Sequence, residues 1–315
     1  MSKSMRAISP REWGSPDVLV PVEVDRPEPG LNEVLIRVHA AGVNPVDWKT
    51  RASGALISWG AVPVPGWDVS GVVEAVGPGV THHRPGDEVF GMPLFPRQAG
   101  AYAEYVVAPA RQVVRKPEGI DHVQAAALPL AALTAWQALV DTAGLEAGQR
   151  VLIHAAAGGV GHLAVQIAKA RGAYVIGTAS AGKHDFLREL GADELIDYRA
   201  VDFTEQVRDV DVVLDGIGNG YGARSLGVLR RGGVLATLPS PDDVPPAGEA
   251  EALGVRTGWT LVEPDNAGLQ EIARLVEAGQ LRVHVDTVLP LDEAAKAHEH
   301  GEQGRTQGKI VLKVR

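Results

Sequence analysis

The residues with the clearest chemical potential form a glycine-rich segment in the middle of the chain, Val151-Leu152-Ile153-His154-Ala155-Ala156-Ala157-Gly158-Gly159-Val160-Gly161. Its apolar beginning predicts a buried strand, and the apolar run 163–170 that follows predicts a helix. A helix that starts at a tight glycine turn has unpaired backbone N–H groups, which can bind a pyrophosphate. The segment therefore predicts the phosphate loop of a dinucleotide-binding βαβ unit.

The spacing within this loop matches the pattern G-x-G-x-x-G, except that Ala156 replaces the first glycine. Gly158 would let the backbone approach the phosphates, and Gly161 would let helix and strand pack closely. Many glycine-rich loops serve turn geometry alone, but a second strand, predicted at 173–178, follows where a βαβ unit requires it. The predicted phosphate contacts are Ala157, Gly158, Gly159, Val160 and Gly161.

The end of this second strand bears on which dinucleotide binds. An NAD site needs a carboxylate there for the ribose 2′-hydroxyl, but the chain has no acid between Thr178 and Asp185. The hydroxyl of Ser180 and the ammonium of Lys183 can instead bind a 2′-phosphate. The alternative is that Ser180 caps a helix predicted at 185–190 and Lys183 is simply solvated. The missing acid favours NADPH.

The elements that must position these residues fall into two groups. Short strands separated by Pro/Gly turns, at 34–41, 69–77, 85–91 and 101–107, predict a β-rich domain up to residue 122. An alanine-rich helical stretch, 123–139, follows with a break at Pro129, and strands and helices then alternate as in a parallel sheet. The remaining predictions are strands at 210–215, 233–238, 255–262, 283–289 and 309–314, helices at 267–278 and 292–300, and a surface loop at 239–252.

Bulk properties exclude several classes of protein. The 315 residues suffice for two domains, and 45% hydrophobic residues with 37 glycines fit an α/β enzyme. A net charge of −9 argues against a general nucleic-acid binder. Without an apolar run of about 18 residues or a signal-like N-terminus, we expect no membrane segment and a cytoplasmic location. The absence of cysteine excludes thiolate catalysis and cysteine-ligated zinc.

Several segments, spread along the whole chain, resemble the medium-chain dehydrogenase/reductase superfamily in its zinc-independent quinone oxidoreductase branch. They are the GVN-P-x-D turn at 42–47, the PG-x-D-x-x-G-x-V segment at 65–73, the AAGGVG loop at 156–161 and the closing strand from Lys309. The resemblance implies a discontinuous GroES-like catalytic domain, 1–122 with 262–315, and a Rossmann NADP-binding domain, 123–261. Helix 267–278 could belong to either, and the cofactor is expected between the two.

The same resemblance implies a chemistry without zinc. Zinc-dependent relatives carry cysteine at the position of Asn44 and a His-Glu pair at that of Trp67-Asp68, so we expect no metal. The implied activity is hydride transfer from NADPH to a quinone or an α,β-unsaturated carbonyl, by a homodimer acting on a small molecule. Two alternatives share the same phosphate loop: an enoyl-thioester reductase of a biosynthetic pathway, and an NADPH-binding sensor without turnover.

The resemblance also assigns site residues. Asn44 is expected near the nicotinamide, although it could instead form an Asx turn before Pro45. The resemblance assigns no proton donor; Tyr102 is one candidate, with solvent as the alternative. Thr134 could contact the nicotinamide or bond its own helix, and Tyr198 could line the 2′-phosphate pocket or only pack. The further expected cofactor contacts are Gly216, Gly218, Leu238, Ser240 and Lys309.

Other polar and aromatic residues are interpreted as structural. Asp47 and Asp68 have no second carboxylate nearby in sequence with which to form an acid/base pair, and His154 should pack inside the sheet. The pairs His82-His83 and His298/His300 lack further ligands at useful spacing, so we expect them at the surface. The tryptophans Trp48, Trp59 and Trp67 could either receive a flat acceptor or belong to the core.

Overall fold

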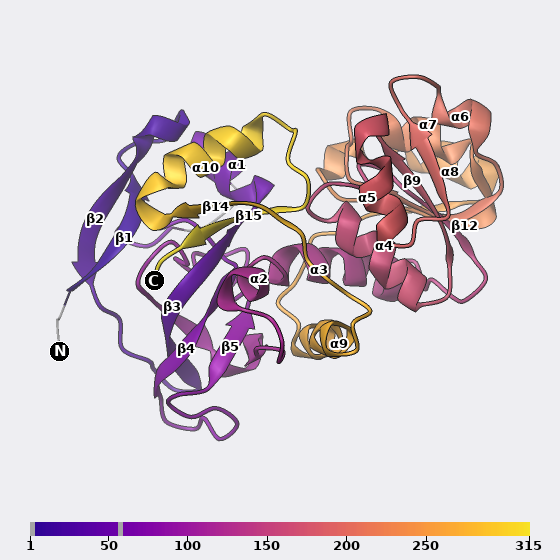
Figure 1. Ribbon diagram of the computed structural model, residues 1–315. Helices are drawn as coiled ribbons and strands as arrows, with labels where there is room; N and C mark the ends of the chain where they lie inside the picture. The colour runs from indigo at the N-terminus through magenta and orange to yellow at the C-terminus, as the bar shows by residue number, and fades with distance from the viewer. Residues whose placement is uncertain (1–3, 56–58) are drawn as a thin grey trace. The chain divides into compact units, whose positions relative to one another are not determined.

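The computed structural model describes residues 4–55 and 59–315, and the chain separates into two compact units (Figure 1). The first unit extends to Leu133 and also contains Glu263–Glu277 and Val283–Arg315. The second consists of Thr134–Val262 and Ala278–Arg282. The first boundary falls after Leu133 rather than after residue 122, because helix α2 (His122–Ala126) packs on strands of the first unit. Helix α9 (Asn266–Glu277) also joins that unit, through contacts with β7 (Val113–Arg115).

The first unit is built on a seven-stranded sheet. Its main path runs β14-β15-β3-β4-β5-β7, and β6 pairs with β3. The bounds are β3 Glu33–Val43, β4 Val69–Val76, β5 Glu88–Gly91, β6 Tyr105–Pro109, β14 Val285–Pro290 and β15 Lys309–Lys313. A separate hairpin pairs β1 (Ser4–Pro10) with β2 (Leu19–Asp25). The strands predicted at 85–91 and 101–107 are thus shorter than expected, and each begins later.

The core of the first unit includes most of its central strand. Val34, Ile36 and Val38 of β3 share one face, as the period of two in a strand requires, and are fully buried. Leu35, on the other face, is buried as well. The last strand, β15, pairs antiparallel with β3, with Ile310 opposite Val43. Helix α10 (Ala294–Glu302) packs on α1 (Pro45–Ser53), so the C-terminal return completes both the sheet and the helices of this unit.

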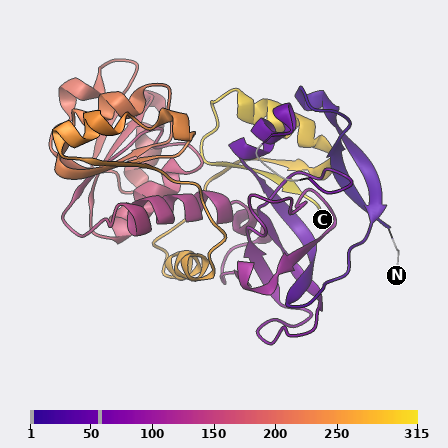
Figure 2. The same cartoon turned by 180° about the vertical axis from the view of Figure 1, so that it is seen from behind.

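The second unit is a six-stranded parallel sheet in the order β10-β9-β8-β11-β12-β13, with helices on both faces (Figure 2). Numbered along the chain, this is the 3-2-1-4-5-6 order of the doubly wound Rossmann fold. The strands are β8 Arg150–Ile153, β9 Tyr174–Ala179, β10 Glu194–Asp197, β11 Val210–Asp215, β12 Leu229–Thr237 and β13 Arg256–Trp259. The predicted α/β class, a GroES-like sheet domain with a Rossmann domain, is confirmed.

The helices of the second unit follow the expected alternation, with one exception. They are α4 Gly161–Ala170, α5 His184–Glu189, α6 Phe203–Gln206, α7 Tyr221–Leu226 and α8 Ala247–Leu253. The prediction of a loop over 239–252 is wrong from Ala247 onward, because α8 begins there and ends at Leu253, followed by Gly254 as a left-handed cap. The break at Pro129 is confirmed: α2 ends before it, and Pro129 begins α3 (Pro129–Trp136), which a π-helix, Gln137–Thr142, continues.

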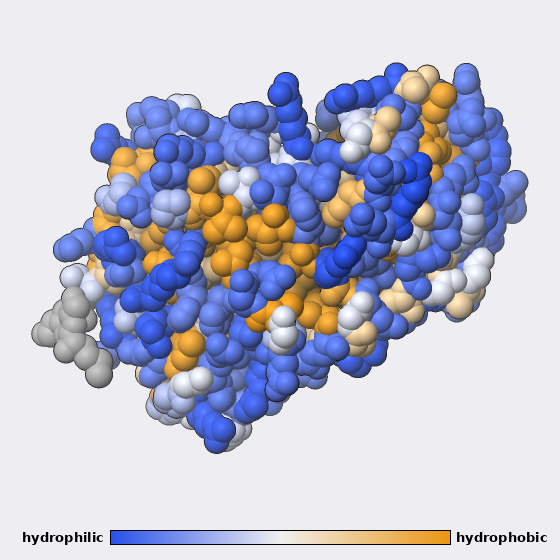
Figure 3. All heavy atoms as spheres, viewed as in Figure 1, coloured by the Kyte–Doolittle hydropathy of each residue, from blue (hydrophilic) through white to orange (hydrophobic). Residues whose placement is uncertain are grey.

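The molecular surface is mostly hydrophilic on the face drawn in Figure 3, with apolar side chains exposed in the region of strand β14. Strand β14 is the edge of its sheet, and its residues alternate between exposed and half-buried. Val288 on this edge is 45% exposed. Among the residues that the structure describes, no helix is long and apolar enough to cross a bilayer.

Candidate active site

The glycine-rich loop lies between the end of β8 at Ile153 and the start of α4 at Gly161. Strand β8 stands between β9 and β11, where the order of the sheet reverses. In open parallel sheets, ligands bind at the carboxyl ends of the strands at this switch point. The loop therefore occupies the position that a dinucleotide phosphate site requires.

The backbone of the loop explains its small residues. A Cβ atom on Gly161 would lie 2.3 Å from the carbonyl oxygen of Ala155 and 2.7 Å from the Cα of Ala156, so no larger residue fits. Ala155 itself has a φ of 51°, which is unusual outside glycine. The N–H of Ala156 donates to the carbonyl of Thr178 on β9 at 3.0 Å. The close approach of helix and strand that the sequence predicts at Gly161 is present, and this cradle fits a pyrophosphate.

The end of β9 carries the residues predicted to bind a 2′-phosphate. Ser180 precedes a 3₁₀ turn, Ala181–Lys183, and its hydroxyl makes no capping hydrogen bond with the described residues of that turn. Strand β10 pairs in parallel with β9, with Asp197 opposite Ala179, so Tyr198 follows beside Ser180 at the same edge. Tyr198 is 46% exposed.

On the other side of β8, Asp215 at the end of β11 shapes the next turn. Its Oδ1 accepts hydrogen bonds from the N–H groups of Ile217, at 2.9 Å, and Gly218, at 3.0 Å. Gly218 has a φ of 71°, which suits glycine. Burial raises the pKa of Asp215. The carboxyl group of Asp215 thus fixes the backbone of the turn that carries Gly216 and Gly218.

Three predicted cofactor contacts of the second unit remain. Leu238 and Ser240 follow β12, and Thr134 lies in α3, the helix before β8. The N–H of Leu238, after β12, donates to the carbonyl of Asp215 at 2.9 Å. Ser240 accepts a hydrogen bond from the N–H of Asp242 at 3.2 Å and begins a 3₁₀ turn. Thr134 is buried in α3. The sheet brings the loops after β8, β9, β11 and β12 to one edge, because all these strands are parallel.

A second polar group, the charged cluster of Asn44, Asp47, Asp68 and Lys309, is buried in the first unit. The N–H of Asn44 donates to Oδ2 of Asp47 at 2.7 Å, at the start of α1. The amide Nδ2 of Asn44 donates to Oδ2 of Asp68 at 2.9 Å, and its Oδ1 accepts from Nζ of Lys309. A 180° rotation of this amide would place its NH₂ group against the ammonium of Lys309 and its oxygen against the carboxylate of Asp68. The two charged groups therefore fix the orientation of the amide.

The ammonium of Lys309 contacts both this cluster and the backbone of β3. Its Nζ donates to the carbonyl of Val43 at 3.0 Å and lies 3.7 Å from Oδ2 of Asp68, and the side chain is 3% exposed. Oδ1 of Asp68 accepts from the N–H of Leu130 at 2.7 Å. Burial raises the pKa of Asp68 and lowers that of Lys309, and the attraction between the two opposes both shifts. The ammonium of Lys309 thus holds the side-chain amide of Asn44 in place.

Asp47 connects the charged cluster to a tyrosine and a histidine. The hydroxyl of Tyr102 donates to Oδ2 of Asp47 at 3.0 Å and lies 3.2 Å from Nε2 of His298. Burial raises the pKa of Asp47 to about 7, and the nearby charge of Asp68 adds to this rise. Burial also lowers the pKa of His298 to about 3, so its ring is neutral. Two carboxyl groups far apart in sequence therefore meet in space, which sequence spacing could not reveal.

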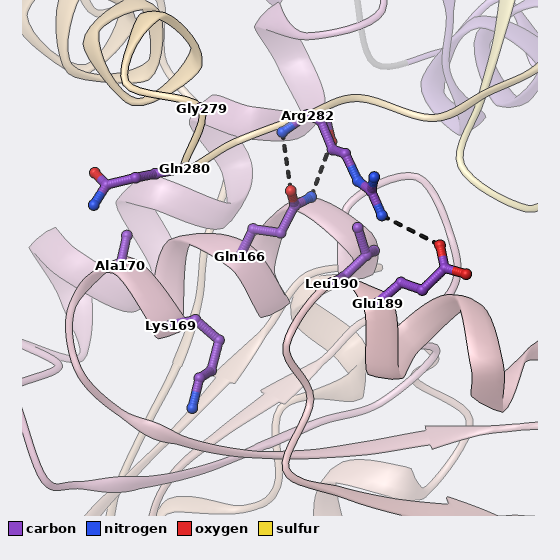
Figure 4. Close-up of a pocket in the computed structure, with 8 residues that line it drawn as sticks. All are labelled: Gln166, Lys169, Ala170, Glu189, Leu190, Gly279, Gln280 and Arg282. Carbon is purple, nitrogen blue, oxygen red and sulfur yellow. Dashed lines mark hydrogen bonds and ion pairs between the residues drawn. The ribbon is translucent and has the colours of Figure 1, made fainter.

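A cavity of about 420 Å³ lies elsewhere on the second unit, beside the C-terminal half of α4 (Figure 4). The side-chain amide of Gln166 exchanges two hydrogen bonds of 2.9 Å with the backbone N–H and carbonyl of Arg282. Arg282 also pairs with Glu189 at 3.4 Å. The phosphate loop is at the opposite end of α4, so this cavity does not belong to the candidate site.

Comparison with known proteins places this geometry in a family. Residues 30–118 match the alcohol dehydrogenase GroES-like domain, and residues 190–312 match the model described as zinc-binding dehydrogenase. The quinone oxidoreductase of Sus scrofa is 36% identical, over 98% of each chain. The chain belongs to the medium-chain dehydrogenase/reductase superfamily, in its quinone oxidoreductase-like branch.

Two further relatives bear on the chemistry of this quinone oxidoreductase-like protein. The crystal structure of Escherichia coli quinone oxidoreductase complexed with NADPH superposes with a TM-score of 0.88 at 30% identity, over 98% of this chain and 100% of that one. The pikromycin polyketide synthase component PikAII of Streptomyces venezuelae is 39% identical over 91% of this chain, which spans 8% of that protein. Family membership makes the chain an oxidoreductase with a nicotinamide cofactor.

The structure corrects several interpretations of histidine and tryptophan residues that the sequence suggested. His298 was expected at the surface, but it is fully buried, because α10 packs on α1 and sets the ring edge-on to Trp48. His83 is also buried, with Nε2 3.1 Å from the carbonyl of Ala110. Trp67 is a core residue rather than a contact for an acceptor: it is 1% exposed, and its Nε1 donates to the carbonyl of Arg97. His154 is buried, as predicted.

Three further predictions concern Tyr102 as a proton donor, Asn44 as a nicotinamide contact, and the absence of a metal site. Tyr102 is fully buried, and its hydroxyl donates to Asp47 and lies within hydrogen-bond distance of Nε2 of His298. Asn44 is 1% exposed, and all the hydrogen bonds described for its side chain are made within the first unit. In the described part of the chain, no three His, Cys, Asp or Glu side chains gather into a group that could hold a metal ion.

Proposed function

We propose that this chain is a zinc-independent reductase that passes hydride from NADPH to a quinone or an α,β-unsaturated carbonyl. The observation that carries the proposal is the end of β9, where Ser180 and Lys183 stand in place of the carboxylate that an NAD site requires. The register of β10 adds Tyr198 at the same edge. Hydroxyl and ammonium groups suit a 2′-phosphate, whereas a carboxylate would repel it.

The second unit would supply binding and orientation. The N–H groups of the loop 157–161 and the positive end of α4 bind the pyrophosphate. Gly216 and Gly218, held by Asp215, let the backbone approach the nicotinamide ribose. Leu238, Ser240 and Thr134 contact the nicotinamide. The bound nicotinamide supplies the hydride, and the protein supplies its placement.

The first unit would present a fixed amide near the reaction. Asn44 contacts the nicotinamide, and Lys309 acts through Asn44 rather than on the cofactor. The ammonium of Lys309, 3.7 Å from Asp68, also places a positive charge where a metal ion would have to bind Asn44 and Asp68, which supports chemistry without zinc. Since Tyr102 is engaged by Asp47, solvent protonates the enolate or quinol. The family resemblance further supports a homodimer.

Kinetics with two cofactors test this proposal. Loss of NADPH absorbance is followed against a panel of quinones, enals and enoyl thioesters, with NADH in parallel. Lys183→Ala should raise the KM for NADPH roughly tenfold, because it removes one charge-assisted contact, and leave the KM for NADH unchanged. The matched control is Lys169→Ala, since Lys169 pairs with Asp193 at 2.8 Å and lies away from the end of β9. Equal rates with NADH and NADPH in the unaltered protein would contradict the assignment.

A second candidate function is reduction of an enoyl thioester. It is supported by the 39% identity with a polyketide synthase component, since polyketide chains are elongated as thioesters. Faster turnover of a crotonyl-type thioester than of any quinone would favour this function. NADPH binding without oxidation by any member of the panel would favour a sensor.

A further inference from the structure

His154 connects the strands and helices beneath the phosphate loop. It follows β8 and is 1% exposed. Its Nδ1 lies 3.2 Å from Oγ1 of Thr178 on β9, and its Nε2 lies 3.0 Å from Oγ of Ser225 on α7. The imidazole of His154 therefore connects the end of β8 to both strand β9 and helix α7.

The directions of these two hydrogen bonds follow from the hydroxyl of Ser225. That hydroxyl donates its single hydrogen to the carbonyl of Tyr221 at 2.7 Å, so it accepts from Nε2–H of His154. Nδ1 then accepts from the hydroxyl of Thr178. Edge-to-face contacts with Phe203 and Tyr221, at centroid distances of 4.6 and 5.1 Å, fix the plane of the ring.

Each partner in this neutral cluster of His154, Thr178 and Ser225 belongs to a segment that would contact NADPH. His154 directly precedes the loop 155–161. Thr178 lies two residues before Ser180, and its carbonyl also holds the N–H of Ala156. Ser225 lies on α7, the helix that follows the glycine turn 216–220. The imidazole is thus linked to all three segments by hydrogen bonds or by the chain itself.

We propose that His154 is a positioning residue that sets the relative placement of these three segments and thereby the affinity for NADPH, without touching the cofactor. The proposal rests on the proposed function. A position that only filled the core would be served by an apolar side chain. Burial of two ring nitrogens is costly unless both are hydrogen-bonded, and here both are.

NADPH affinity of the full chain, measured by fluorescence titration, tests the proposal. His154→Phe keeps a ring that can pack against Phe203 and Tyr221 but removes both hydrogen bonds. We expect the Kd for NADPH to rise roughly tenfold, while turnover at saturating NADPH stays within about twofold. Val210→Ala is the matched control, because Val210 is buried at the opposite end of β11 and its loss destabilises the unit without touching the three segments.

Two milder variants keep the proposal falsifiable if His154→Phe does not fold. Ser225→Ala and Thr178→Val each remove one of the two hydrogen bonds, and each should raise the Kd by a smaller factor. An unchanged Kd in folded His154→Phe, or in both milder variants, overturns the proposal. An equal rise in Val210→Ala overturns it as well, because the effect would then reflect stability alone. A wild-type chain that does not bind NADPH contradicts the proposed function itself.

Discussion

The two units bury polar groups in different ways. The charged cluster of the first unit joins residues distant in sequence, from Asn44 to Lys309, with two carboxyl groups around one ammonium. The neutral cluster of the second unit joins adjacent elements of one sheet through an imidazole and two hydroxyl groups. Removing one partner from a buried charge costs far more than removing one from a neutral hydrogen bond. The comparison predicts that the first cluster governs stability and the second governs placement.

The largest effect should come from the ammonium of the charged cluster. Lys309→Met leaves the carboxylate of Asp68 buried without its counter-charge, so we expect a loss of about 3–5 kcal/mol in the free energy of unfolding. Denaturant unfolding measures it. Lys313→Met, at an exposed position of the same strand, is the control and should change stability by less than about 0.5 kcal/mol.

Adding Asp68→Asn to Lys309→Met sharpens this result. The double variant removes the negative charge as well, so it should recover a large part of the lost stability. If the free energies of unfolding lost in Lys309→Met and in Asp68→Asn simply add in the double variant, Lys309 and Asp68 are not coupled. The predicted difference between the charged and the neutral cluster is then wrong.

The second effect depends on pH. The pKa of Asp47 rises from 3.8 to about 7 on folding, so its carboxyl group keeps a proton in the folded chain that it loses when unfolded. The folded chain therefore binds this proton more tightly than the unfolded chain, and the free energy of unfolding falls as pH rises from about 4 to about 7. Asp47→Asn does not titrate, so the stability of this variant relative to wild type should increase by up to about 4 kcal/mol between pH 4 and pH 8.

The buried histidine of the second unit does not obscure this measurement. His154, whose pKa is lowered to about 3, destabilises both proteins equally as pH falls from 6.5, so its effect cancels in the difference between variant and wild type. The effect of His298, whose pKa is also lowered to about 3, cancels only while the contact with Tyr102 is kept, and the amide oxygen that Asp47→Asn introduces can still accept from that hydroxyl. A stability difference that is constant across this pH range would show that Asp47 does not titrate as proposed.

A smaller effect is expected at the phosphate loop. Gly161→Ala places a Cβ atom against the carbonyl of Ala155, and the forced shift should cost about 1–3 kcal/mol. Gly182→Ala, where a Cβ meets open space, should stay within about 0.5 kcal/mol. Thermal unfolding compares the two, and an equal response would mean that the loop tolerates the close approach.

The smallest effect concerns the residue next to His154. Ala155 has a φ of 51°, so Ala155→Gly relieves backbone strain but adds freedom to the unfolded chain. The two nearly offset each other, and we expect a gain of about 0.5 kcal/mol. A loss above about 1 kcal/mol would show that the methyl group packs and that the loop is held by more than the neutral cluster.

Local signals predicted the Rossmann unit better than the first unit. The phosphate loop and the missing acid after Thr178 are each visible within a few residues. The charged cluster joins Asn44, Asp47, Asp68 and Lys309, and Tyr102 and His298 adjoin it at Asp47. Only the sheet and the packing of α10 on α1 bring these residues together. The same long-range packing buries His298, which has no local apolar context. The shorter strands near 88 and 105 show that a pattern of apolar residues does not fix where pairing starts.

The pairing of β15 with β3 has a consequence for synthesis on the ribosome. Strand β15 lies between β14 and β3, and it follows every other strand of its sheet along the chain. The first sheet therefore cannot close until residues 309–313 have been made, although most of its strands are made much earlier. The second sheet needs no strand beyond β13, so it is the first that can complete its folding on the growing chain.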